Sequence, residues 1–257
     1  MPTSDVEPEE LDRLHNLLDY VGYELDPSIL IGGWATNLRV GGDISRVIDL
    51  IINDLALRSA LREKLDDYSE NRHHSGGMKA RGTVDGVHID AYIPYESQLG
   101  DKLLLRVEEL ARFTDAGVIK GWFLLTLEAH VVTKMAALLD RPDTEKGQKD
   151  ARELLALLKE GVDPAAAIAI LFTASAAEHA LIPGYMAQVF ELLPERARAN
   201  KAERRILDRL RREWIAEAER QSRDDDSAGL PRPMLSGGLG EPTDLGTSGR
   251  RIGDSNP

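Results

Sequence analysis

The hydrophobic pattern of this 257-residue chain changes character near Glu128. Before that point, short β-branched runs alternate with helical segments and glycine-containing turns, a pattern typical of strands and helices that share one sheet. Beyond it, apolar residues recur at helical spacing. The sequence therefore predicts an α/β (α+β) fold, in which a mixed β-sheet flanked by helices is followed by a C-terminal helical region.

Local signals assign a structure to each segment. Asp85-Gly86 is a strong two-residue turn signal, so the runs on either side of it are expected to form a hairpin. The expected strands cover 28–31, 47–52, 78–83, 87–93 and 118–125, and 70–77 is expected to be a polar loop. The expected helices cover 8–20, 34–40, 54–65, 104–113, 127–139, 145–160, 163–178, 184–193 and 197–221.

Composition predicts three stretches along the chain. We expect an α/β domain over 1–126, a helical domain over 127–221 and a disordered tail over 222–257. The tail begins with charged residues and then contains many Gly, Pro and Ser. It therefore has few apolar side chains to bury in a core.

Charge and cysteine content limit the class of function. A formal charge of −12 argues against wholesale binding of nucleic acid, because phosphate neutralisation needs Lys and Arg, but it allows a local basic surface. With no cysteine, the chain forms neither disulfides nor thiolate metal sites. It has no run of eighteen apolar residues and no secretory signal at its start, so we expect a cytoplasmic protein that does not bind membranes.

A Gly-Gly pair lies between an expected strand and an expected helix. Gly32 and Gly33 follow Ile29-Leu30-Ile31 and precede Trp34-Ala35. Glycine lets the backbone pass close to a phosphate, and the free N–H groups at the start of a helix favour an anion. A plain strand-to-helix turn explains the pair equally well.

Asp49 interrupts the β-branched strand at 47–52. Side chains alternate along a strand, so Asp49 shares one face with Val47 and Ile51. An ionised carboxylate among apolar residues is costly unless it is paired, and a divalent metal would pair with it. The alternative is a structural aspartate held by a backbone N–H or by Arg46.

Asp90 has a similar position in the strand at 87–93, where it shares a face with His88 and Tyr92. If the two strands are neighbours, Asp49 and Asp90 meet on one face of the sheet. Converging carboxylates of this kind hold Mg²⁺, and pairs of such ions support in-line phosphoryl chemistry. Taken alone, each acid is also explained by a structural role.

Taken in order, these motifs resemble the DNA polymerase β-like nucleotidyltransferase superfamily. More closely, they are similar to the AbiEii-type nucleotidyltransferases, which include toxins of toxin–antitoxin systems. The likeness covers about residues 28 to 160 and implies a nucleotidyltransferase fold over the α/β domain. It rests on Gly32-Gly33-Trp34-Ala35, Ser45-Arg46-Val47-Ile48-Asp49-Leu50, Ile89-Asp90-Ala91-Tyr92-Ile93-Pro94-Tyr95 and, further along, Glu128, Lys134, Arg141, Lys146-Gly147 and Lys149-Asp150.

The resemblance implies a role for each matching residue. Asp49 and Asp90 would bind Mg²⁺ or Mn²⁺, with Asp90 also placed to assist the attacking hydroxyl. Lys134 would meet phosphate charge, and Asp150 would orient that lysine or the nucleotide. The residues implied in nucleotide binding are Gly32, Gly33, Ser45, Lys134 and Lys149, and those implied in catalysis are Asp49, Asp90, Lys134 and Asp150.

The implied reaction moves a nucleoside monophosphate from an NTP to an RNA acceptor, such as a tRNA end, and releases pyrophosphate. The same resemblance implies an antitoxin protein as a partner. Two other hypotheses stay open. One is a non-catalytic protein that uses the fold to bind a nucleotide or a partner, and the other is a small-molecule nucleotidyltransferase of the aminoglycoside-modifying kind.

Val47 departs from the family pattern, which has a pair of acids at positions i and i+2 of this strand. Val47 stands where the first of these acids is expected. Asp43 precedes it, but four extended residues span on the order of 13 Å, so Asp43 replaces it only if the loop folds back. We favour a catalytically impaired protein or an inactivated variant. The opposite interpretation keeps one metal on Asp49, Asp90 and the phosphates, with reduced activity.

A helix expected near 195–213 is rich in arginine. If the acceptor is RNA, this helix is the best local surface for phosphate contacts. Its interspersed acids also fit a solvated face stabilised by Glu–Arg pairs. Its basic residues are Arg196, Arg198, Lys201, Arg204, Arg205, Arg209, Arg211 and Arg212.

Overall fold

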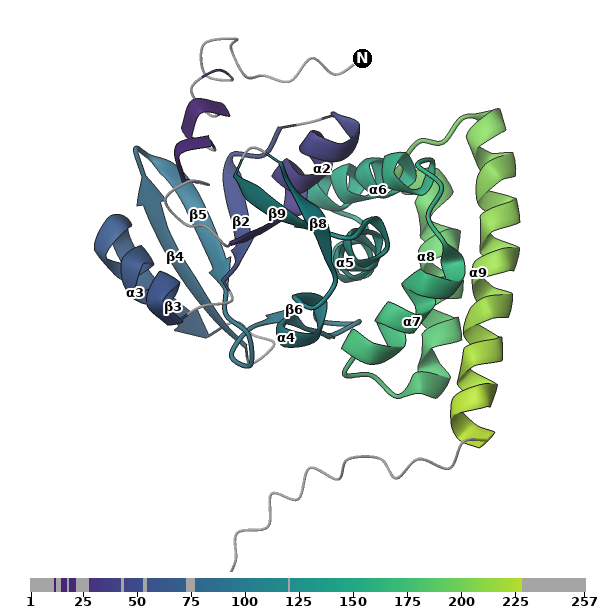
Figure 1. The fold of residues 1–257 in the computed structure, drawn as a ribbon. Helices are drawn as coiled ribbons and strands as arrows, with labels where there is room; N and C mark the ends of the chain where they lie inside the picture. The colour runs from purple at the N-terminus through teal and green to yellow at the C-terminus, as the bar shows by residue number, and fades with distance from the viewer. Residues whose placement is uncertain are drawn as a thin grey trace, which may run out of the picture.

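The computed structural model describes residues 12, 15–17, 19–21, 28–42, 44–52, 55–72, 77–119 and 121–227. A mixed β-sheet occupies one side of the molecule, and helices pack against it and extend to the other side (Figure 1). The predicted fold class, a mixed sheet flanked by helices and followed by a helical region, is confirmed. None of the described helices is long and apolar enough to cross a lipid bilayer.

The main sheet has the strand order β3-β4-β5-β2-β1-β9-β8. Strand β2 pairs in parallel with β5, and β1 pairs in parallel with β9, while the other neighbours are antiparallel. Strands β6 and β7 form a separate two-stranded ladder. The strands are β1 (Ile29–Ile31), β2 (Val47–Ile51), β3 (Asp66–Arg72), β4 (Met78–Val84), β5 (Val87–Tyr92), β6 (Gln98–Leu99), β7 (Leu105–Arg106), β8 (Thr114–Ile119) and β9 (Trp122–Leu125).

Three helices of the second half begin at clear capping residues. Thr126 and Thr144 accept hydrogen bonds from backbone N–H groups at the starts of α5 and α6, and Asp163 does so before Pro164 of α7. The helices are α2 (Gly32–Val40), α3 (Leu55–Lys64), α4 (Val107–Leu110), α5 (Leu127–Asp140), α6 (Glu145–Leu158), α7 (Pro164–Ala174), the 3₁₀ turn η1 (His179–Leu181), α8 (Ile182–Arg196) and α9 (Lys201–Ser227).

The two faces of the central strands bury into different cores. On one face, Ile48 and Leu50 of β2 pack with Leu61 of α3 and with the neighbouring strands. On the other face, Ile51 and Ile29 pack into a core that includes α5 and α6. Asp49 shares this second face, so the one polar side chain of β2 lies toward α5 and α6.

Three segment predictions are wrong. The residues 70–72 predicted as loop belong to β3, an edge strand whose polar side chains hide its backbone pairing with β4. The helix predicted over 104–113 is reduced to the single turn of α4, because residues 105–106 pair as β7. The single strand predicted over 118–125 is a hairpin of β8 and β9 that turns at Gly121, which has a φ of +81°.

Several boundaries also differ from the expectation. Helix α2 begins at Gly32, two residues before the predicted start, and α9 continues to Ser227, beyond the predicted start of the tail at 222. Residues 228–257 and most of 8–20 lie outside the described residues, although the described ones within 12–20 are helical. The division at 126/127 stays a prediction, and one apolar core contains residues from both sides of it.

Candidate active site

Asp49 and Asp90 lie side by side on neighbouring parallel strands. The register pairs Asp49 of β2 with Asp90 of β5, so both side chains are on the same face of the sheet. On the other side of β2, Asp49 pairs with Ile31, the residue that precedes Gly32. The two predicted carboxylates and the Gly-Gly turn therefore meet at one place.

The two glycines are required by close contacts with this strand. Gly32 has a φ of +69°, and a Cβ atom there would lie 2.4 Å from Asp49 Oδ2. A Cβ atom on Gly33 would lie 2.9 Å from the Cβ of Ser45 and 3.6 Å from Lys149 Nζ. Helix α2 starts here without a side-chain cap. Its first backbone N–H groups are therefore not capped by a side chain from the residue before the helix.

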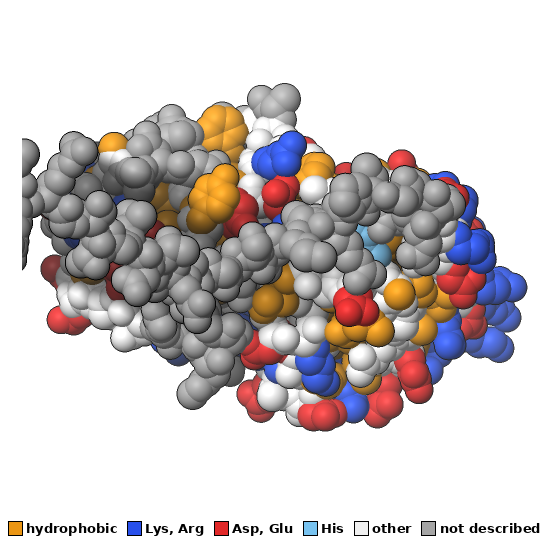
Figure 2. All heavy atoms as spheres, turned by 90° about the horizontal axis from the view of Figure 1, so that it is seen from below, with side chains coloured by type: hydrophobic (Ala, Val, Ile, Leu, Met, Phe, Trp, Pro, Cys, Tyr) orange, Lys and Arg blue, Asp and Glu red, His pale blue; other side chains and the backbone are white. Residues whose placement is uncertain are grey.

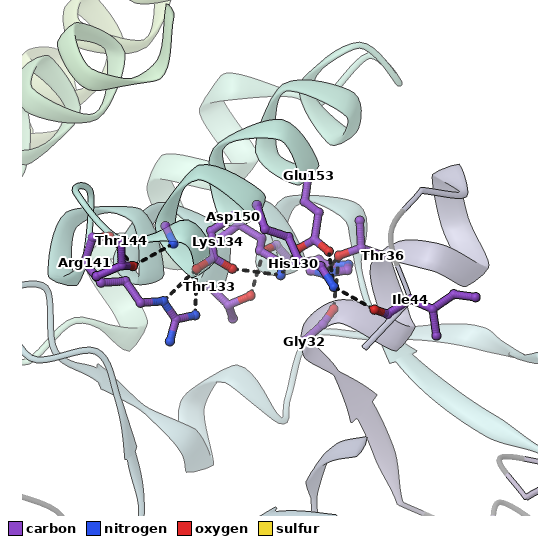
Figure 3. A network of polar contacts seen from close by, with 12 residues as sticks. Gly32, Thr36, Ile44, His130, Thr133, Lys134, Arg141, Thr144, Asp150 and Glu153 are labelled. Carbon is purple, nitrogen blue, oxygen red and sulfur yellow. Dashed lines mark hydrogen bonds and ion pairs between the residues drawn. The ribbon is translucent and has the colours of Figure 1, made fainter. Parts of the chain in front are cut away.

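Helices α5 and α6 lie across from the two aspartates and form the other wall of the site. Lys134 of α5 contacts Glu153 and lies 3.3 Å from Asp150 Oδ1, and these side chains are almost completely buried. Arg141 Nε donates to the other Asp150 oxygen at 2.8 Å. Figure 3 shows Lys134 and Arg141 meeting Asp150 from two sides.

A second set of contacts joins this wall to the start of α2. Thr36 Oγ1 donates to the Gly32 carbonyl at 3.0 Å and lies 3.1 Å from Nε2 of His130 on α5 (Figure 3). Burial lowers the pKa of His130 well below its usual value, so the imidazole is neutral. Lys149 Nζ of α6 donates to the Ile44 carbonyl at 3.1 Å, which fixes the loop before β2.

Strand β4 adds two cations that the sequence analysis did not identify. Arg81 pairs with Asp90 in the register, and Lys79 pairs with Tyr92, so both face the carboxylates. Lys79 Nζ contacts Asp90, and Arg81 Nε lies 3.1 Å from Asp90 Oδ1. A two-residue turn at Asp85-Gly86 fixes this register, so the sequence did contain a signal for both residues.

All eight predicted site residues line one cavity of about 390 Å³. The described lining residues include six basic and six acidic side chains, although the whole chain carries a net charge of −12. The cavity lining is therefore neutral overall, on a chain that is acidic overall. The predicted residues are Gly32, Gly33, Ser45, Asp49, Asp90, Lys134, Lys149 and Asp150, and the further charged residues are Lys79, Arg81, Asp101, Asp140, Arg141, Lys146 and Glu153.

The charged groups of the sheet influence one another through burial. Burial raises the pKa of the Asp49 carboxyl, and the positive charge of Lys79 opposes this rise more than any other group. Burial lowers the pKa of Lys79, and Asp90 only partly offsets that effect. Burial also raises the pKa of Tyr92, with contributions from both aspartates. These groups therefore form one electrostatically coupled cluster.

The residues do not fit a metal site built from three protein carboxylates. Val47, two residues before Asp49 on the same face, pairs with His88, and a third acid there would extend the set. Lys79 and Arg81 already neutralise Asp90. Nowhere in the described chain are three His, Cys, Asp or Glu side chains arranged to hold a metal ion. Asp43 lies outside the described residues, so the Mg²⁺ or Mn²⁺ expected from the resemblance stays a prediction.

No protein-family model matches the chain, and no curated protein matches its sequence. Among solved structures, it is similar to an antigenic nucleotidyltransferase-like protein from Paracoccidioides brasiliensis, with 17% identity, a TM-score of 0.38, and coverage of 61% of this chain and 79% of that one. It is also similar to the Thermotoga maritima CCA-adding enzyme complexed with tRNA, with 14% identity and a TM-score of 0.30. That match covers 73% of this chain and 53% of the enzyme. We therefore argue function from the residues of the cavity.

Proposed function

We propose that the cavity binds a nucleoside triphosphate and that the protein has the design of a nucleotidyltransferase. The observation that carries this proposal is the direct pairing of Asp49 with Asp90 beside Gly32, opposite the cations of α5 and α6. The lining is neutral overall on an acidic protein, and the lysines beside the start of α2, Lys146 and Lys149, favour an anionic ligand there. A volume of about 390 Å³ also lies within the range of small-molecule sites.

The phosphates are best accommodated at the start of α2. Lys149 Nζ and the first turn of α2 face the same space, because Lys149 lies next to the missing Cβ of Gly33. Lys146 is exposed at the cavity and makes no ion pair within the described part of the chain. Uncapped N–H groups and two lysines together would bind the charged oxygens of a triphosphate.

Asp49 is the carboxylate best placed to accept a proton from the attacking hydroxyl. It is half-buried and makes no ion pair with a described residue, and burial makes it more basic than an ordinary aspartate. Asp90 is paired with Lys79 and Arg81, so we assign the role of proton acceptor to Asp49. The hydroxyl oxygen would attack the α-phosphorus, and the bond to the bridging oxygen would break to release pyrophosphate. This proposal does not require Mg²⁺ or Mn²⁺.

Within this proposal, the acceptor is an RNA such as a tRNA end, and the protein acts as the toxin of a toxin–antitoxin pair. Its support is the resemblance together with the exposed arginines of α9, among them Arg204, Arg205 and Arg211. Acidic side chains are interspersed with basic ones at the end of the molecule that carries α9 (Figure 2). Charge reversal of these three arginines should abolish RNA labelling if they bind the acceptor, and should leave it unchanged if the face is only solvated.

The transfer reaction is tested by restoring the acid at position 47. Val47→Asp and the wild type are incubated with each α-³²P-labelled NTP, cellular RNA and Mg²⁺. We expect Val47→Asp to label RNA at least about tenfold more than the wild type, because a third carboxylate on the face of Asp49 and Asp90 would add a ligand for Mg²⁺, an ion that the wild-type site does not require. Val47→Asn is the matched control, because it adds a polar group of the same size without the charge. Equal labelling by both variants, or none by either, would contradict a transferase site.

Nucleotide binding without transfer is the second candidate function. Two observations favour it, namely Val47 in place of an acid and the pairing of Asp90 with Lys79. It predicts that the wild type and Val47→Asp both bind ATP in equilibrium dialysis and that neither labels RNA or protein. Lys146→Met should weaken that binding about tenfold, while Lys159→Met, at the opposite end of the same helix and outside the cavity lining, should not.

A further inference from the structure

We propose that Lys79 is a built-in cation that takes the place of a divalent metal ion between the two aspartates, so that a triphosphate binds here without metal. This inference rests on the proposed nucleotide site and concerns how that site balances charge. It assigns a function to a residue that no motif marked.

The position of Lys79 is fixed from several sides. Its side chain is only 7% exposed, its Nζ contacts Asp90, and the ammonium lies 4.7 Å from the centre of the Tyr92 ring. The contact with the ring is a cation–π interaction, which stabilises a desolvated ammonium. Strand β4 therefore delivers a positive charge to the face of the sheet where the two carboxylates meet.

The charge of Lys79 acts on both carboxylates. It contacts Asp90 directly, and among the charged groups around Asp49 it has the largest influence on that carboxyl. An ammonium is a compact cation with three donor hydrogens. It can therefore contact Asp90 and still have donors that point toward Asp49 or a phosphate oxygen.

The charges of this site already balance without a metal. Asp49 and Asp90 contribute two negative charges, and Lys79 and Arg81 contribute two positive charges. A divalent ion at the same place would leave an excess of two positive charges and would have to displace a buried ammonium. A third acid would reduce that excess, and the chain has Val47 where it would stand. The missing acid at Val47 and the ammonium of Lys79 therefore have the same consequence, which is a site that is neutral without a metal ion.

The test is the metal dependence of ATP binding, measured by isothermal titration calorimetry in EDTA and in Mg²⁺. For the wild type, the Kd in the two buffers should agree within about threefold. Lys79→Met, which keeps the length of the side chain, should raise the Kd in EDTA by about tenfold or more, the effect of losing one charge-assisted hydrogen bond. Lys79→Arg should restore most of the affinity, and Lys159→Met is the matched control.

Binding of Mn²⁺ without nucleotide gives an independent readout by electron paramagnetic resonance. The wild type should not broaden the Mn²⁺ signal, whereas the double variant Val47→Asp/Lys79→Met, with three acids and no ammonium, should bind the ion. Circular dichroism and thermal melting check that each variant is folded.

The outcomes separate this inference from the proposed function. ATP binding that occurs only with Mg²⁺, or an affinity in EDTA that Lys79→Met leaves unchanged, overturns the role of Lys79 and leaves the nucleotide site standing. Mn²⁺ binding by the wild type also overturns it. If ATP binds in neither buffer, the proposed nucleotide site itself is wrong.

Discussion

Two charged clusters border the cavity, and they have a similar composition but differ in how many of their acids are paired with the lysine. The sheet cluster consists of Lys79, Arg81, Asp90 and Asp49, and the helix cluster consists of Lys134, Arg141, Asp150 and Glu153. Each contains one lysine, one arginine and two acids. In the helix cluster the lysine contacts both acids, whereas in the sheet cluster it contacts one, and Asp49 makes no ion pair with any described residue.

The pKa values of the two lysines show what this difference means. Burial alone would lower the pKa of Lys134, but Glu153 and Asp150 outweigh burial and raise it. For Lys79, burial is the larger effect and the pKa is lowered. The helix cluster therefore satisfies its own charges and joins α5 to α6. The sheet cluster is balanced in total charge, but burial outweighs the single contact of Lys79 with Asp90, so Lys79 gains further stabilisation from a ligand that accepts its remaining donors.

The largest expected difference between the clusters is in stability. Lys134→Met should lower the free energy of unfolding by about 3–5 kcal/mol, because it leaves the buried Glu153 without its contacting cation and leaves Asp150 with Arg141 alone. Lys79→Met should cost much less, because Arg81 still pairs with Asp90. Urea denaturation monitored by circular dichroism measures both, with Lys159→Met expected within about 0.5 kcal/mol of the wild type. Equal losses for Lys79 and Lys134 would contradict the comparison.

The two clusters also differ in what their aspartates contribute to stability. Asp150→Asn should destabilise by about 2–3 kcal/mol, because charged hydrogen bonds to Lys134 and Arg141 are lost. Asp49→Asn should not destabilise at pH 7 and should weaken ATP binding. The raised pKa of Asp49 means that its carboxyl holds the proton more tightly in the folded protein than in the unfolded chain. Ionisation of Asp49 therefore costs stability as the pH rises above 3.8.

The direction of the Asp49 pKa shift predicts how stability changes with pH. The stability of the wild type relative to Asp49→Asn should fall as pH rises from below 3.8 toward neutrality, and the two curves should converge at acid pH. Unfolding curves at a series of pH values provide the measurement. A wild type that gains stability over the variant as pH rises would show that Asp49 is a paired, structural carboxylate.

A smaller effect is expected from the close approach of Gly32 to the sheet cluster. Gly32 and Gly41 both have positive φ values, +69° and +72°, so alanine at either costs about 1–2 kcal/mol in backbone strain. Only Gly32→Ala also places a Cβ atom against Asp49, whereas nothing lies within 4 Å at Gly41. We expect Gly32→Ala to cost about 1–3 kcal/mol more than Gly41→Ala and to weaken ATP binding. Equal melting temperatures would argue against this contact.

The sequence predicted the site where the pattern of one strand was informative. Asp49 and Asp90 are single acids in apolar strands, and alternation predicted which face of its strand each occupies. Lys79 and Arg81 were missed because their relevance depends on pairing across a hairpin rather than on their own strand. The role predicted for Gly32, close approach to a phosphate, was also incomplete, since the atom nearest to a Cβ at this position belongs to the Asp49 carboxylate.

The fold was least predictable where strands are polar or very short. Strand β3 contains few apolar residues, and it is supported by backbone pairing with β4 and by Glu70, which pairs with Arg58 and Arg62. Such tertiary contacts leave no periodic hydrophobic signal. In contrast, α5 and α6 have both a helical pattern and capping threonines, and their predicted bounds agree with the structure within two residues.

The central claim is that Asp49 and Asp90 meet at a triphosphate site, and a crystal structure with a non-hydrolysable ATP analogue in EDTA tests it most directly. The predicted result places the phosphates between the start of α2 and Lys149, with Lys79 in contact with Asp90 and a phosphate oxygen. Phosphates bound elsewhere, or a Lys79 side chain turned away from Asp90 once the analogue is bound, would contradict the account.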